Sequence, residues 1–69
     1  MKDFDCISAG IMFLFDNYAE DEELASFIEN IDCAENDLDI KKNVDFIIKI
    51  LDNRFDKNSQ VIKQLFKTL

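Results

Sequence analysis

Residues 39–54 read DIKKNVDFIIKILDNR and carry the clearest periodic signal in the chain. Apolar side chains recur there three and four residues apart, a spacing that places them on one side of an α-helix. Continued one residue further, this stripe holds Ile40, Val44, Ile47, Ile48, Leu51 and Phe55. The pattern predicts an amphipathic helix whose apolar side faces a core.

The same spacing recurs on both sides of this segment. The first stripe, in residues 4–18, holds Phe4, Ile7, Ile11, Leu14, Phe15 and Tyr18; the next holds Leu24, Phe27, Ile28 and Ile31; the last holds Val61, Ile62, Leu65, Phe66 and Leu69. Polar residues 32–37 and 53–59 predict connections, and no strand alternation is sustained. We therefore expect an all-α protein, a compact bundle of four short helices in a single acidic domain over residues 1–69, with three helices as the fallback.

Two helix starts have candidate signals. The acidic run 20–23 is expected to open the second helix, because the exposed N–H groups of a first turn favour negative charge. Asn58 or Ser59 is a suitable N-cap for the fourth helix.

The composition limits the functions open to the chain. Its 69 residues include 15 acids, 8 bases and no histidine, so the commonest general base and metal ligand is missing. Gly10 is the only glycine, which excludes a glycine-rich phosphate loop. The acidic segment 32–39 lacks the glycine and the closing glutamate of a calcium loop. We expect no enzymatic activity, no cofactor and no metal site.

The two cysteines, Cys6 and Cys33, fit no zinc or redox spacing. We expect reduced thiols, typically small buried apolar groups. A disulfide within or between chains is the alternative.

The apolar run Cys6–Phe15 is too short to span a bilayer. Lys2, Asp3 and Asp5 give its N-terminal flank a net negative charge, whereas a signal peptide needs a positive one. We expect a cytoplasmic protein, and the abundance of residues with AT-rich codons hints at a bacterial or phage origin.

Charge is divided unevenly along the chain. Residues 1–40 carry 12 acids and one lysine, a net charge of −11, and residues 41–69 carry seven bases and three acids, a net charge of +4. Such asymmetry hints at an interaction surface, unless the acidic half simply folds against the basic half. The total of −7 argues against direct binding to nucleic acid or to an anionic membrane.

Some apolar residues lie off the stripes. Phe13 and Cys6 lie opposite the main stripe of the first helix, and Ala9 and Gly10 on that side are small enough to admit another element. Phe46 and Ile50 leave the stripe of the third helix. Either both helices bury two sides, or these residues form a patch for a partner or a second copy.

Ten acids between residues 16 and 39 form a candidate acidic belt: Asp16, Glu20, Asp21, Glu22, Glu23, Glu29, Asp32, Glu35, Asp37 and Asp39. The belt could cover a basic cleft of a partner, or it could be a solvated face that keeps the protein soluble. The predicted partner-binding residues are Phe13, Asp16, Tyr18, Glu20, Asp21, Glu22, Glu23, Glu29, Asp32, Glu35, Phe46 and Ile50.

Size, acidity and helicity together favour a small inhibitor that neutralises a basic protein partner by occluding its substrate or nucleic-acid cleft. Immunity proteins against nuclease toxins have this profile, as do antitoxins and phage-encoded inhibitors of nucleic-acid-binding machinery. A homo-oligomeric structural or regulatory module, such as a homodimer, is the alternative from another class. A DNA-binding helical module requires that another protein cover the acidic half.

Overall fold

The computed structural model describes the backbone of residues 2–69 and the side chains of residues 7–69. Four α-helices follow one another: α1 (Lys2–Tyr18), α2 (Ala25–Asp32), α3 (Asp37–Asn53) and α4 (Asn58–Leu65). No strand occurs among residues 2–69, so the prediction of an all-α bundle of four short helices is confirmed. None of these helices has the length and apolar content needed to cross a bilayer.

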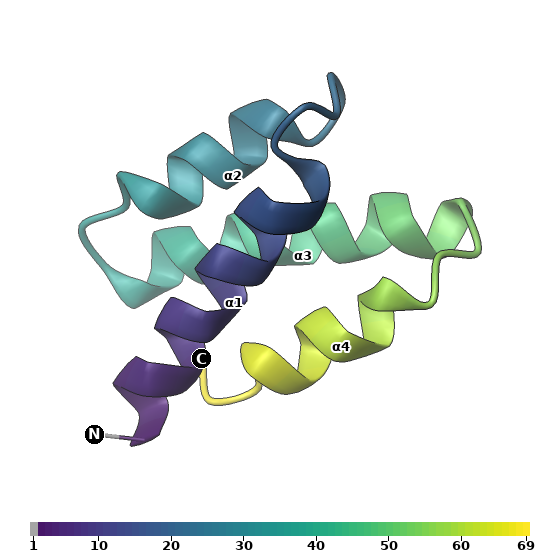
Figure 1. Cartoon of the computed structure of the whole chain (residues 1–69). Helices are drawn as coiled ribbons and strands as arrows, with labels where there is room; N and C mark the ends of the chain where they lie inside the picture. Colours follow the sequence, from purple (N-terminus) through teal and green to yellow (C-terminus); the bar gives the residue numbers. More distant parts are fainter. Residues whose placement is uncertain (1) are drawn as a thin grey trace.

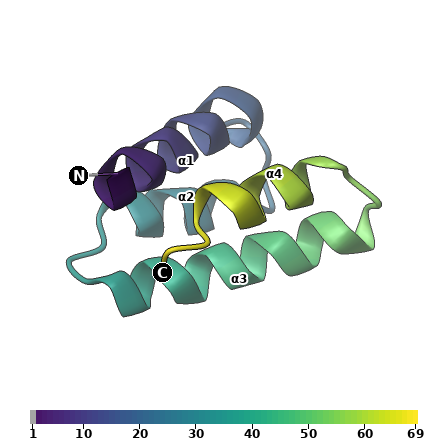
Figure 2. The same cartoon turned by 90° about the horizontal axis from the view of Figure 1, so that it is seen from below.

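Each helix packs against two of the other three, with α2 and α4 lying between α1 and α3. α2 and α3 run antiparallel, and α4 returns alongside α3 (Figure 1). α1 packs on α2 and α4, and α3 packs on the same two helices from the other side (Figure 2). The resulting body measures 32 × 21 × 20 Å.

The core is built from residues of the predicted stripes. The fully buried side chains are Leu14, Leu24, Ile28, Ile31, Ile47, Leu51 and Ile62. Each such side chain contributes roughly 1.5–3 kcal/mol of burial free energy, so this cluster is the main stabilising element. Phe13 and Ile50 are half-buried and pack against it, which means that the fold already uses part of both side chains.

Gly10 allows α1 and α4 to approach each other closely. A Cβ atom at this position would lie 2.5 Å from both Cε2 and Cζ of Phe66, well inside van der Waals contact. Phe66 is buried, so its ring has little room to move away. The close approach expected beside Ala9 and Gly10 is therefore found at Gly10, whereas Ala9 is exposed. Phe4 was predicted on the main stripe of the first helix and Cys6 opposite it, and both side chains lie outside residues 7–69, whose side chains the structure describes.

The starts of α2 and α4 differ from the sequence prediction. α2 begins after the acidic run, and of that run Asp21 receives the backbone N–H groups of Glu23 and Leu24 at 3.0 and 3.1 Å. The predicted N-cap of α4 is wrong, because Asp56 already accepts the N–H of Asn58 at 2.9 Å and Lys57 occupies the cap position. At both helix starts, a carboxylate just ahead of the helix accepts the free N–H groups.

The end of α3 holds the largest departure from prediction. The N–H of Asp56 donates to the carbonyl of Leu51 at 3.0 Å, and the N–H of Phe55 donates to the carbonyl of Asp52 at 3.1 Å. This is a Schellman motif, and it puts Phe55 at the left-handed position, with φ 58°, that glycine usually occupies. The turn carries Phe55 off the core stripe and leaves it 93% exposed.

Phe15 and Val61 were also expected to face the core and are instead exposed. Both lie at an edge of an apolar stripe, where the packed helices do not reach.

Candidate protein-binding surface

The acidic belt is divided between two ends of the molecule. Asp16 and the run 20–23 lie at the end of α1 and in the connection to α2, whereas Asp32, Glu35, Asp37 and Asp39 surround the connection from α2 to α3. The eight residues of α2 separate the two clusters by roughly 12 Å, with Glu29 between them. The belt therefore forms two acidic clusters and not one continuous surface.

The first cluster adjoins the connection between α3 and α4. Arg54 joins the two segments, with Nη1 2.7 Å from Oδ2 of Asp21 and Nη2 2.6 Å from Oε1 of Glu23. Both connections lie at the same end of the bundle (Figure 1). We call this end, formed by residues 16–23 and 52–57, the turn face.

Tyr18 fastens the turn face from inside. It is only 8% exposed, and its hydroxyl donates to Oδ2 of Asp56 at 2.6 Å and accepts from Nδ2 of Asn58 at 2.8 Å. Burial raises the pKa of Tyr18, and the hydrogen bond to Asp56 raises it further. The expectation that Tyr18 anchors a partner is corrected, because its ring and hydroxyl are used within the fold.

Three of the acids on this face serve the structure. The hydrogen bonds from Arg54 lower the pKa of Asp21, and the hydrogen bond from Tyr18 lowers the pKa of Asp56. Glu23 also binds the guanidinium of Arg54, and the hydrogen bonds to Asp21 and Glu23 raise the pKa of Arg54. Together these contacts hold the two connections side by side.

Of the four remaining acids of the turn face, Asp52 pairs with Lys63, and the fold leaves the other three unused. Asp16, Glu20 and Glu22 are exposed, and none forms an ion pair with a residue of the described part of the chain. Asp16 lies in the last turn of α1, where the partial negative charge of the helix end disfavours a carboxylate and no base offsets it. These charges are available to a partner.

Phe55 adds an aromatic side chain that sequence reasoning had assigned to the core. A left-handed backbone costs an L-residue about 1–2 kcal/mol, and a ring this exposed returns almost no burial energy. The sequence did contain a signal for this, because residue 55 falls inside the polar stretch 53–59 that already predicted a connection.

A second exposed aromatic lies elsewhere, on the outer side of the α2–α3 pair. Phe46 is 52% exposed and stacks on Phe27, with ring centroids 5.4 Å apart and planes inclined by 24°. Eight residues, or roughly 12 Å of helix, separate Phe46 from Arg54. The structure thus brings Phe46 and the turn face to different surfaces.

The basic residues remain mainly on α3 and α4. Lys41 pairs with Asp45 and Lys63 with Asp52, each at 3.6 Å and each within the second half of the chain. Among residues 7–69, Arg54 alone forms an ion pair with the acidic half. Folding of one half against the other therefore neutralises little of the charge asymmetry.

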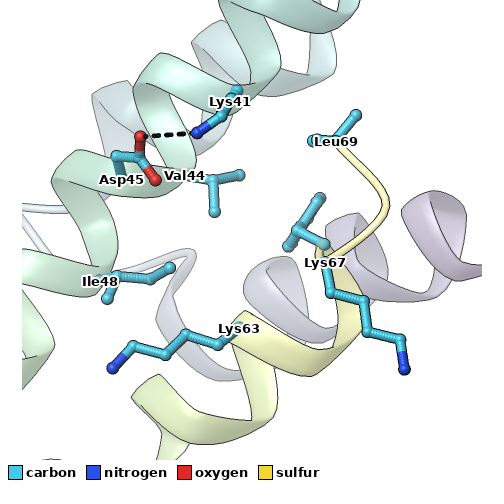
Figure 3. A pocket seen from close by; sticks show the side chains of 8 residues that line it. Lys41, Val44, Asp45, Ile48, Lys63, Lys67 and Leu69 are labelled. Carbon is cyan, nitrogen blue, oxygen red and sulfur yellow. Dashed lines mark ion pairs between the residues drawn. The ribbon is translucent and has the colours of Figure 1, made fainter.

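Lysines also border a groove between α3 and α4. Lys63 lies on α4 and Lys67 in the turn that follows it, and both border this groove with Val44 and Ile48 of α3 (Figure 3). Its volume of about 200 Å³ is below the roughly 300–1,000 Å³ of typical ligand pockets. The groove gives no support to a small-molecule site.

Cys33 is an exposed free thiol, which corrects the expectation of burial, and the side chain of Cys6 lies outside the described part. Within the described residues, no three acidic, cysteine or histidine side chains gather around a point that could hold a metal ion.

The turn face therefore combines an exposed aromatic ring with three unpaired carboxylates on a scaffold fixed by Arg54 and Tyr18. Comparison with protein-family models, curated proteins and solved structures finds no match to this chain.

Proposed function

We propose that this chain is a small acidic protein-binding inhibitor that neutralises a basic protein partner by covering its substrate or nucleic-acid cleft. The turn face is the binding surface, with Phe55 as its anchor. The observation that carries the proposal is the conformation of Phe55, which is 93% exposed at φ 58°. The Schellman hydrogen bonds account for the left-handed backbone, but they do not account for a phenylalanine at this position, and residues held in costly conformations cluster at functional sites.

The charges around Phe55 indicate the kind of partner. Residues 16–23 and 52–57 hold seven acids against Arg54 and Lys57, a net charge of −5. A basic surface would be attracted to this end of the molecule, and complementary charge raises association rates and enforces specificity. Salt screens such exposed charges over about 8–10 Å, so binding should weaken as salt rises.

The anchor and the charges would have separate roles. A buried aromatic anchor at the centre of an interface supplies about 2–4 kcal/mol, and the surrounding charges mainly steer and orient. Asp16, Glu20 and Glu22 can meet basic groups of a partner without breaking a contact of the fold.

An immunity protein against a nuclease toxin is the most specific form of this proposal. A nuclease binds phosphates with a basic cleft, and an inhibitor that blocks that cleft needs no catalytic residue of its own. A phage-encoded inhibitor of nucleic-acid-binding machinery would use the same surface. A cytoplasmic location in a bacterium belongs to the same proposal.

Affinity capture from a lysate of the native host tests this function. The bait is the wild-type chain, beside Phe55→Ala and the control Met12→Ala, which truncates another exposed apolar residue (64%) outside the turn face. We expect one stoichiometric basic protein that binds at low salt, elutes as salt rises, is retained by Met12→Ala and is lost by Phe55→Ala. Recovery of the bait alone, or equal capture by Phe55→Ala, would overturn the proposal.

A further inference from the structure

We propose that the outer side of the α2–α3 pair binds the same surface of a second copy, forming a two-fold symmetric dimer. Its centre is the stack of Phe27 on Phe46. Phe55 lies outside this surface, and of the residues that form it Glu22 alone also belongs to the turn face, so the dimer does not depend on the proposed inhibitor function.

The aromatic centre is suited to self-association. Phe46 leaves half of its surface in water although Phe27 covers one side of its ring. An identical stack on a second copy would cover the remaining ring surface. Exposed aromatic clusters of this kind mark contact sites, and aromatic residues are enriched at the centres of interfaces.

Rows of opposite charge flank the centre. Glu22 precedes α2 and Glu29 lies on it, while Lys42 and Lys49 lie on α3; each pair is seven residues apart, or roughly 10.5 Å in helical geometry. All four side chains are exposed, and none forms an ion pair within the described residues. One chain therefore presents an acidic row and a basic row side by side, both unpaired.

The register of these rows fits one two-fold arrangement. Because α2 and α3 are antiparallel and Phe27 contacts Phe46, Glu29 lies level with residue 44, two residues or roughly 3 Å from the level of Lys42. By the same register Glu22 lies level with residue 51, which is again two residues, or roughly 3 Å, from the level of Lys49. A two-fold axis parallel to the helices lays α2 of one copy on α3 of the other and preserves these levels. A perpendicular axis in the interface would instead oppose like charges.

The size of the surface sets the expected affinity. The whole molecule measures 32 × 21 × 20 Å, so no side of it covers more than roughly 670 Å², less than the roughly 800 Å² that each partner buries in a standard interface. We expect a reversible dimer with a dissociation constant on the order of micromolar to hundreds of micromolar.

Sedimentation equilibrium over about 1 µM to 1 mM protein measures this association. Phe46→Ser should weaken the dimer about tenfold or more, and Met12→Ser, an exposed control on α1, should leave it unchanged. Circular dichroism of each variant establishes that it is folded. A wild-type monomer at every concentration would overturn the proposal.

Charge reversal tests the register. Lys42→Glu and Glu29→Lys should each weaken self-association several-fold, because each creates two like-charged contacts across the axis. An equimolar mixture of the two variants should form a heterodimer of near wild-type affinity. In that heterodimer, the carboxylate introduced at position 42 of one copy faces the ammonium group introduced at position 29 of the other. Failure of the mixture to associate would rule out this arrangement.

Discussion

Replacement of Phe55 by glycine should stabilise the fold. At φ 58° the left-handed backbone costs an L-residue about 1–2 kcal/mol, whereas glycine adopts it freely. Glycine also makes the unfolded chain more flexible, which cancels about 0.4–1 kcal/mol of the stability gained by relieving the backbone. The phenyl ring is 93% exposed, so its removal sacrifices little burial. We expect a net gain of about 0.5–1 kcal/mol in the free energy of unfolding, or about 2–8 °C in Tm.

Urea unfolding followed by far-ultraviolet circular dichroism measures this gain. Phe55→Ala is the matched control, because it removes the ring and keeps the strained backbone, and its stability should stay within about 0.5 kcal/mol of wild type. A glycine variant no more stable than the alanine variant would show that the left-handed backbone at position 55 carries no such cost. A large loss in the alanine variant would equally contradict the prediction, since the ring would then belong to the core.

Three further predictions concern the scaffold. Gly10→Ala should lower the free energy of unfolding by about 1–3 kcal/mol, because its Cβ meets Phe66, and Phe66→Leu in the same chain should recover part of the loss in urea unfolding. Phenolate absorbance of Tyr18, the single tyrosine, should show a pKa above 10.0 that shifts back toward 10.0 in Asp56→Asn. The stability linked to this raised pKa is present below pH 10 and is lost as the pH rises through the pKa of Tyr18 in the folded protein. Arg54 lowers the pKa of Asp21 below 3.8, so stability present at neutral pH should fall as the pH drops below 3.8, and the urea midpoint of Asp21→Asn should fall less.

The helices and the core could be predicted from the sequence because they depend on periodicity. Leu14, Ile28, Ile47, Leu51 and Ile62 recur at helical spacing, and all five are fully buried. Periodicity shows which side of a helix is apolar. It does not show where the helix ends.

The candidate site was predicted only in part, because it is built from helix ends. No glycine or proline marks the end of α3, so the stripe was extended to Phe55, whereas the Schellman hydrogen bonds to Leu51 and Asp52 turn the chain first. Arg54 pairs with Asp21 and Glu23, which lie 33 and 31 positions earlier in the sequence, and no local pattern encodes such contacts. The acidic cluster was visible in the sequence, but its aromatic anchor was not.

Hydrogen–deuterium exchange on the complex with the captured basic partner tests most directly whether the turn face is the binding surface. We predict added amide protection in residues 16–23 and 52–57, with residues 38–49 of α3 unchanged relative to the chain alone at the same concentration. Protection centred on Phe27 and Phe46, with the turn face unaffected, would contradict it.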